Sequence, residues 1–202
     1  MEQLFHIKAL KLLSINITIV KQIFMQNTLK LMTGSPFPAI EVTLLDGTTV
    51  DLGKAHSGAD WQMLVVYRGR HCPLCVRYLN LLEQHIAALK AIGVSVSTVS
   101  GDSKIQLEEN IEKLNTTFPI AYGLTEQQMK QLGLYISAPR SEQETDHNFS
   151  EPALFVVNAD GVLQAANISN TPFLRPEMDV VVRGLTFVRS QDNYPIRGTV
   201  AY

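Results

Sequence analysis

Residues 61–75 read WQMLVVYRGRHCPLC and decide both the fold and the candidate chemistry of this chain. The apolar run 61–67 is typical of a central strand that is buried on both faces of a sheet. Pro73 suits the first position of a helix, where its missing N–H costs nothing, and Gly93 is a natural helix end. The stretch therefore predicts a strand, a tight junction that carries Cys72 and Cys75, and a helix over 73–92.

The sequence on either side continues this alternation. Two short apolar segments at 40–45 and 48–52 flank Asp46-Gly47, which predicts a β-hairpin. Capping boxes predict two helices that begin after Ser103 and Thr125. The remaining expected segments are strands at 94–99 and 118–121, a loop at 137–150, a hairpin at 152–157 and 162–168, a helix at 175–188 and an irregular tail at 191–202.

A strand–helix–strand unit followed by a hairpin and a helix is the order of the thioredoxin fold with insertions. We therefore predict an α/β fold in which a central mixed β-sheet is flanked by helices. The expected organisation is an N-terminal extension over 1–32 and one redox domain over 33–202. The apolar run at 12–20 is too short to span a bilayer and has no signal-peptide cleavage pattern, so the extension reads as an added helix or an over-long start.

The amino-acid composition limits the classes of partner that the protein is expected to bind. The 202 residues are 46% hydrophobic and 18% charged, with a net charge of −2. No basic stripe indicates nucleic acid, and no segment indicates a membrane span. We expect a cytoplasmic protein that binds neither.

The chain has two cysteines, Cys72 and Cys75. A structural disulfide gains most from closing a long loop, and this loop is very short. A structural zinc site normally needs four ligands, and the pair supplies two. A zinc site that borrows histidines and an inert pair both stay open as alternatives, but a redox-active dithiol is favoured.

The surroundings of the pair favour a thiolate. Cys72 is expected at the N-cap of the helix, where unpaired N–H groups and the helix dipole stabilise negative charge. The flanking cations are Arg68, Arg70, His71 and Arg77. Cys75 lies on the apolar face of the helix, so we expect Cys72 to be the exposed attacking thiolate and Cys75 the resolving thiol.

Several motifs together resemble the peroxiredoxin-like (AhpC/TSA-type) branch of the thioredoxin superfamily. They are GSPFP (34–38), VYRGRHCPLC (66–75), EPALFVV (151–157), FLRP (173–176) and NYPIRG (193–198). The resemblance implies a peroxiredoxin-type N-terminal hairpin and an antioxidant, thiol-dependent peroxidase activity. It further implies no bound cofactor or metal, an external thiol reductant such as thioredoxin or glutathione, and a homodimer.

The resemblance also assigns residues. Pro152 matches the cis-proline that faces the redox pair, and Arg175 resembles the arginine beside the peroxidatic thiolate. The typical motif PxxxTxxC, aligned on Cys75, would place threonine where Cys72 stands and would make Cys75 peroxidatic. The alignment thus names Cys75 as the attacking thiol, whereas the helical pattern names Cys72. Because the two lines of reasoning disagree, we expect both cysteines to be catalytic.

More than one interpretation stays open for each of two neighbouring residues, Glu151 and His71. Glu151 either accepts a proton or pairs with Arg68, Arg70 or Arg175, or else it faces solvent. His71 either tunes the pair or is a surface histidine. Three functions are compatible with the site: a hydroperoxide-reducing peroxidase, a thiol–disulfide oxidoreductase, and a redox-inert binding module.

Overall fold

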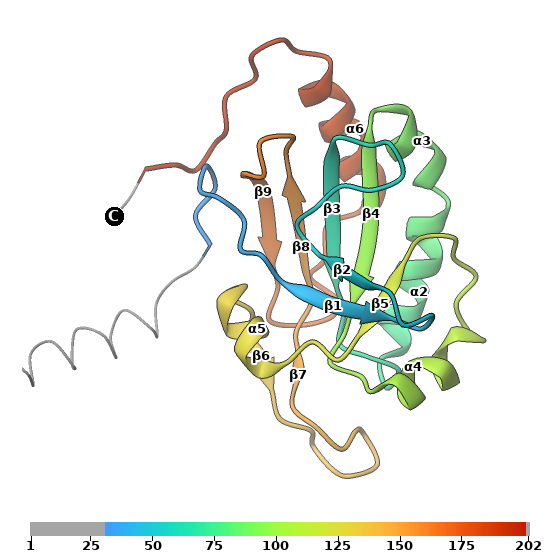
Figure 1. Cartoon of the computed structure of the whole chain (residues 1–202). Coiled ribbons are helices and arrows are strands. Elements are labelled where there is room, and N and C mark those ends of the chain that lie inside the picture. Colours follow the sequence, from blue (N-terminus) through green and yellow to red (C-terminus); the bar gives the residue numbers. More distant parts are fainter. Residues whose placement is uncertain (1–30, 201–202) are drawn as a thin grey trace, which may run out of the picture. The chain divides into compact units, whose positions relative to one another are not determined.

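The computed structural model describes residues 31–200, and Figure 1 shows their arrangement. The apolar run at 12–20, on which the predicted N-terminal extension rests, lies outside the described residues. Within them, no helix is long and apolar enough to cross a membrane.

A seven-stranded mixed sheet forms the centre of the fold, as the sequence predicts (Figure 1). Strand β3 runs parallel to β4 and antiparallel to β8, with Met63 opposite Val96 and Val156. In spatial order, the strands are β2 (Thr49–Asp51), β1 (Glu41–Leu44), β5 (Ile120–Tyr122), β4 (Val94–Val99), β3 (Trp61–Val66), β8 (Ala153–Val157) and β9 (Leu163–Ile168). The predicted hairpins β1–β2 and β8–β9 are both present.

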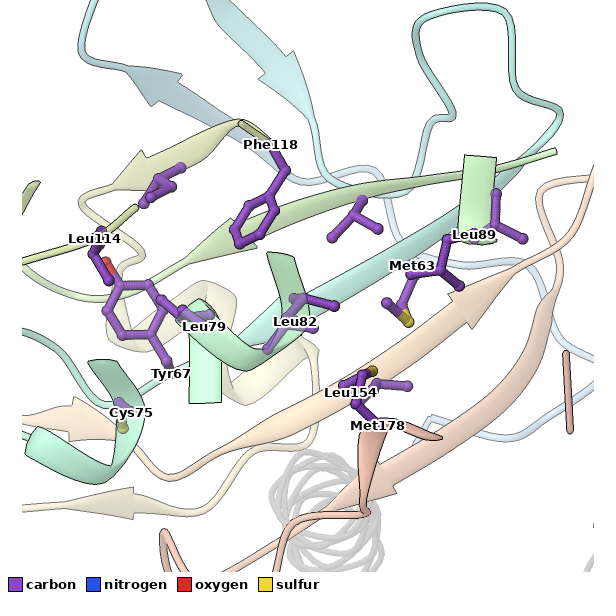
Figure 2. Close-up of a cluster of buried hydrophobic side chains, with 14 of the residues drawn as sticks. Met63, Tyr67, Cys75, Leu79, Leu82, Leu89, Leu114, Phe118, Leu154 and Met178 are labelled. Carbon is purple, nitrogen blue, oxygen red and sulfur yellow. The ribbon is translucent and has the colours of Figure 1, made fainter. Parts of the chain in front are cut away.

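Strand β3 contributes to two hydrophobic cores because its side chains alternate between the two faces of the sheet. Met63 and Val65 belong to the core that contains Leu79 and Leu82 of the helix after β3 (Figure 2). Leu64 and Val66 belong to the core on the other face. Burial on both faces explains why this segment is so apolar.

The prediction of one continuous helix over 73–92 is wrong. The structure has α2 (Pro73–Glu83) and α3 (Ile86–Ala91). At the break, the N–H groups of Gln84 and His85 donate to the carbonyls of Leu81 and Leu82, which are the tighter bonds of a 3₁₀ turn. The two capping boxes are confirmed at the starts of α4 (Lys104–Ile111) and α5 (Glu126–Gln131).

Two further boundaries differ from the sequence prediction. Helix α6 (Met178–Arg189) begins after Arg175, which lies in the preceding irregular segment. The loop predicted over 137–150 contains a small hairpin made by β6 (Ile136–Ser137) and β7 (Phe149–Ser150). Strands of two residues have too little side-chain alternation to be recognised from sequence.

Candidate active site

The two cysteines lie where β3 leads into α2. Cys72 is the N-cap residue of α2 with an extended backbone, and Pro73 occupies the first turn. The Cys72 carbonyl accepts the N–H of Cys75 at 2.9 Å. The predicted N-cap position is confirmed, although the Cys72 side chain accepts no capping hydrogen bond.

The two sulfurs are in direct contact, with 2.6 Å between the Sγ atoms, and both cysteines are free. The exposed fraction is 2% for Cys72 and 0% for Cys75. The prediction that Cys72 is exposed is therefore wrong. Its side chain turns toward Cys75 and joins the same core as Tyr67 and Leu79 instead of pointing outward from the helix end.

The contact between the sulfurs shifts the pKa values of the two thiols in opposite directions. The pKa of Cys72 is lowered to about 6, and the largest cause is the hydrogen bond from the Cys75 thiol. The Cys75 N–H and the charges of Arg175 and Arg68 lower this pKa further, whereas burial opposes the shift. The pKa of Cys75 is raised by burial and by its sulfur neighbour. These opposite shifts favour the thiolate on Cys72 and the proton on Cys75.

Arg175 lies at the pair, as expected. Its Nη2 is 3.1 Å from the Cys75 Sγ, and its Nε donates to the Pro172 carbonyl at 3.0 Å. The guanidinium stacks over the ring of Tyr78, whose hydroxyl donates to the Pro176 carbonyl at 3.0 Å. Tyr78, one helical turn beyond Cys75, therefore positions the segment that carries the arginine.

Glu151 is buried, with an exposed fraction of 5%, so the solvent-facing interpretation is wrong. Its Oε2 lies 3.4 Å from the Arg68 Nε, and its Oε1 accepts the Ser137 hydroxyl at 2.7 Å. Arg68 also reaches Glu144, at 3.5 Å, and stacks over Phe149. The alternative in which Glu151 pairs with Arg68 is the one that forms.

The Glu151–Pro152 bond is trans, since the described residues contain no cis peptide bond, and the predicted cis-proline is wrong. Residues 151–152 join β7 to β8, and backbone hydrogen bonds hold them on both sides. The Glu151 N–H donates to the Tyr135 carbonyl, and the Pro152 carbonyl accepts the Ser169 N–H.

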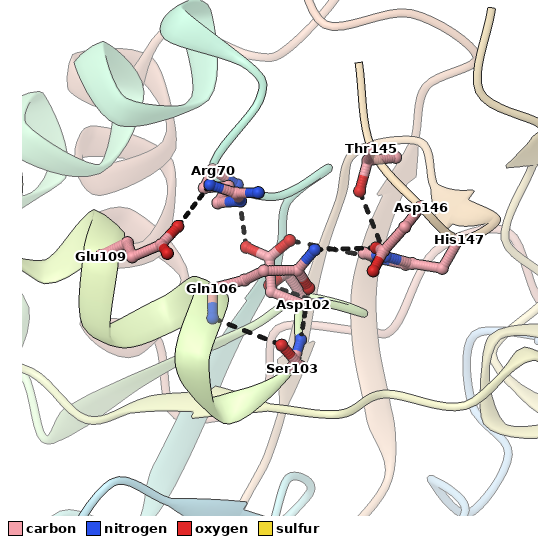
Figure 3. A network of polar contacts seen from close by, with 9 residues as sticks. Arg70, Asp102, Ser103, Gln106, Glu109, Thr145, Asp146 and His147 are labelled. Carbon is pink, nitrogen blue, oxygen red and sulfur yellow. Dashed lines mark hydrogen bonds and ion pairs between the residues drawn. The ribbon is translucent and has the colours of Figure 1, made fainter. Parts of the chain in front are cut away.

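His71 and Arg70 take other positions than the sequence suggests. The His71 ring packs on Phe149 at 4.5 Å between centroids, and burial and the Arg68 charge lower its pKa to about 4. The Arg70 guanidinium pairs with Glu109, while its N–H donates to the Asp102 Oδ2 at 2.8 Å (Figure 3). The backbone of Arg70 thus fixes residues 67–72, the segment between β3 and α2 that we call the redox loop.

The sequence analysis missed Asp102 as the residue that holds this loop. Its carboxyl is fully buried, and burial raises its pKa. Figure 3 shows it beside a network in which Gln106 and His147 both bond Asp146. The neighbouring capping box at Ser103 was recognisable, but nothing local marks Asp102. No group of three potential metal ligands occurs among the described residues.

A thioredoxin-like sheet with adjacent thiols at the start of α2 defines a thiol-dependent redox protein. The chain belongs to the AhpC/TSA family, because the model of that family matches residues 33–166. Enzymes of this kind are thiol-dependent peroxidases or oxidoreductases, and the chain is one of them. No curated protein sequence matches the chain.

Solved structures confirm the fold. A peroxiredoxin-like protein from Aquifex aeolicus has a TM-score of 0.65 at 18% identity, covering 80% of this chain and 90% of its own. AhpC from Mycobacterium tuberculosis has a TM-score of 0.65 at 16% identity, covering 81% and 96%. Peroxidoxin BcpB from the same organism has a TM-score of 0.64 at 16% identity, covering 79% and 99%.

Proposed function

We propose that the chain is a thiol-dependent hydroperoxidase in which Cys72 attacks and Cys75 resolves. The observation that carries the proposal is the contact chain from Arg175 through Cys75 to Cys72, at 3.1 and 2.6 Å. A half-buried guanidinium at the pair stabilises negative charge on sulfur and on a departing oxygen.

In the first step, the Cys72 thiolate attacks the terminal oxygen of a hydroperoxide. The O–O bond breaks, the OH group passes to sulfur so that Cys72 becomes a sulfenic acid, and the departing alkoxide or hydroxide takes a proton from solvent and leaves as alcohol or water. The sulfur loses two electrons and the peroxide gains them. A low pKa keeps Cys72 in the reactive thiolate form at neutral pH.

In the second step, Cys75 loses its proton and attacks the Cys72 sulfur. The S–O bond breaks, water leaves, and an S–S bond forms. Arg175 supports this step because its Nη2 contacts the Cys75 sulfur, where the thiolate must form. An external thiol then reduces the disulfide, and we propose no bound cofactor for the cycle.

A thiol–disulfide oxidoreductase is the second candidate. It is favoured by Cys72 itself, which stands where the typical peroxiredoxin motif has a threonine that helps to hold the peroxide. A thiol hydrogen-bonds more weakly than a hydroxyl and binds peroxide less well. The same dithiol would then exchange with a substrate disulfide.

The test is rapid mixing of the reduced protein with hydrogen peroxide, beside an insulin-disulfide reduction assay. Wild type, Cys72→Ser and Cys75→Ser are compared. The proposal expects Cys75→Ser to form a sulfenic acid that a dimedone probe traps, and Cys72→Ser to stay unoxidised. Oxidation of Cys72→Ser alone would reverse the two roles, and insulin reduction without peroxide oxidation would favour the second candidate.

A further inference from the structure

Arg68 lies in the redox loop, four residues before Cys72, and its side chain is largely buried, with an exposed fraction of 17%. The motif PxxxTxxC, aligned on Cys75, has proline at this position, so the family resemblance assigns Arg68 no role. We infer that Arg68 is a further positioning residue of the site, whose guanidinium charge helps to hold Cys72 as a thiolate. The inference rests on the proposed function, because it concerns the attacking sulfur of that cycle.

Two carboxylates that are distant in sequence hold the Arg68 guanidinium. Its Nη2 lies 3.5 Å from the Glu144 Oε1, and its Nε lies 3.4 Å from the Glu151 Oε2. Both carboxylate side chains are largely buried. Ion pairs that are mostly buried are screened little by salt, so these two contacts keep the guanidinium in one place.

Each of the two carboxylates is itself held by further contacts. The Glu144 Oε2 accepts the Arg140 N–H at 2.7 Å and the Arg140 Nε at 3.1 Å. The Glu151 Oε1 accepts the Ser137 hydroxyl at 2.7 Å. The β6–β7 hairpin, its loop and the residue after it therefore supply fixed partners for Arg68.

The ring of Phe149 connects Arg68 to the residue before Cys72. The Arg68 Cζ lies 4.5 Å from the centroid of this ring, and the His71 ring packs on the same ring at 4.5 Å between centroids. Because His71 directly precedes Cys72, the shared ring keeps the guanidinium close to residues 71–72. At short range, a fixed cation favours the ionised form of a thiol.

The pKa values of two consecutive residues agree with this position. The pKa of Cys72 is lowered first by the hydrogen bond from the Cys75 thiol. The charges of Arg175 and then of Arg68 lower it further. The pKa of His71 is lowered first by burial and next by the Arg68 charge. The Arg68 charge therefore acts on residues 71 and 72 alike.

The titratable and charged groups around Arg68 and Cys72 come from several elements. They are Tyr67 and His71 of the redox loop, Cys75 and Tyr78 of α2, Asp102 after β4, Glu144 of the β6–β7 loop, Glu151 before β8 and Arg175 before α6. His71, with its pKa of about 4, is neutral where Cys72 titrates. Glu144 is ionised there, because hydrogen bonds from Arg140 lower its pKa to about 2.

The test is alkylation of Cys72 by iodoacetamide as a function of pH, which requires no peroxide. In Arg68→Gln, the midpoint is expected to rise by about half a pH unit, less than in Arg175→Gln, because the Arg175 charge has the larger effect. The rate should then fall about twofold at pH 6 and change little at pH 8, where the thiolate is formed in both proteins. Arg68→Lys keeps the charge and should retain most of the wild-type midpoint.

Arg140→Gln is the matched control, because Arg140 pairs with the same Glu144 but its side chain is 86% exposed. Its midpoint should equal that of the wild type. Arg68→Gln also leaves the buried Glu151 without its ion-pair partner, which destabilises the fold. The double variant Arg68→Gln/Glu151→Gln removes both charges of this pair, and its midpoint should still lie above that of Glu151→Gln alone.

A wild-type midpoint in Arg68→Gln, or an equal loss of rate at pH 6 and pH 8, would overturn the inference and leave Arg68 with a structural role only. So would an equal shift in Arg140→Gln, or equal midpoints in the double variant and Glu151→Gln. Single-turnover oxidation of the wild type by peroxide tests the proposed function separately, since alkylation reports the Cys72 thiolate whichever substrate it attacks.

Discussion

The guanidinium of Arg175 donates from Nη2 to the Sγ of Cys75 at 3.1 Å, across a hundred residues of sequence. The contact is made to the more buried of the two sulfurs, whose thiol in turn donates to Cys72 at 2.6 Å. In the proposed cycle, the arginine therefore acts on the attacking sulfur of Cys72 through its charge and on the resolving sulfur of Cys75 by direct contact. The same arginine can therefore stabilise negative charge both when Cys72 is oxidised and when Cys75 resolves the sulfenic acid in the proposed cycle.

Replacing Arg175 by Gln is expected to slow single-turnover oxidation by peroxide about 10- to 100-fold, which corresponds to the loss of a hydrogen bond to a charged group. The thiol pKa of the pair should rise, because the arginine charge lowers it. Arg175→Lys keeps the charge without the planar fork and should lose less. Full activity in Arg175→Gln would remove the arginine from the mechanism.

Alkylation by iodoacetamide should modify Cys72 before Cys75, as read by peptide mass spectrometry. Its rate should have a midpoint near pH 6, where the pKa of Cys72 lies, and should fall as the pH drops below that value because the thiolate becomes protonated. The His71 pKa of about 4 is too low to produce this midpoint. Preferential labelling of Cys75 would support the alignment in which the second cysteine is peroxidatic.

Cys75→Ala is expected to move the alkylation midpoint of Cys72 upward, toward the ordinary value of a thiol. The reason is that the hydrogen bond from Cys75 is the largest cause of the lowered pKa. Cys75→Ser is the matched control, since its hydroxyl still donates and should preserve much of the shift. An unchanged midpoint in Cys75→Ala would show that the Cys75 N–H and the neighbouring arginines set it without the Cys75 thiol.

The parts of the fold that the sequence predicts are those with a local cause. The apolar run of β3, the glycine turns of the hairpins and the capping boxes at Ser103 and Thr125 each depend on neighbouring residues. The break between α2 and α3 and the small β6–β7 hairpin depend on tertiary packing. Their sequences carry no signal that separates them from a continuous helix and a loop.

The features of the candidate site also separate into those that the sequence predicts and those that it does not. The cysteine pair and its N-cap position follow from the motif, and the approach of Arg175 follows from the family resemblance. The burial of Cys72, the trans bond at Pro152 and the loop contact of Asp102 do not. Each of these depends on which distant backbone group faces the residue, and a single sequence does not contain that information.

Glu151→Gln is expected to destabilise the protein by about 1–3 kcal/mol, because it removes a buried charge from Arg68 while keeping an acceptor for Ser137. Glu109→Gln is the matched control, since its pair with Arg70 is exposed and should contribute less than about 1 kcal/mol. Urea denaturation of both variants measures the difference. Equal losses would show that the Glu151 pair stabilises no more than a surface contact.

Gly69 occupies a position in the redox loop where a side chain would be strained. Its φ is +133°, which favours glycine, and a Cβ there would collide with the Asp102 carboxylate. The same carboxylate accepts the N–H of Arg70, and the Gly69 carbonyl accepts the N–H of Cys72 at 3.1 Å. A side chain at Gly69 would therefore disturb both contacts that fix the loop.

Gly69→Ala is expected to cost about 1–3 kcal/mol from the backbone alone, with more from the collision, and to slow peroxide oxidation because Cys72 shifts. Gly184→Ala is the control: it lies in helix α6 with open space around its Cα, and it should stabilise the protein by about 0.5–1 kcal/mol at an unchanged rate. Urea denaturation and rapid-mixing oxidation measure both effects. If Gly69→Ala keeps the wild-type stability and rate, the contact between Asp102 and the loop does not position the thiolate.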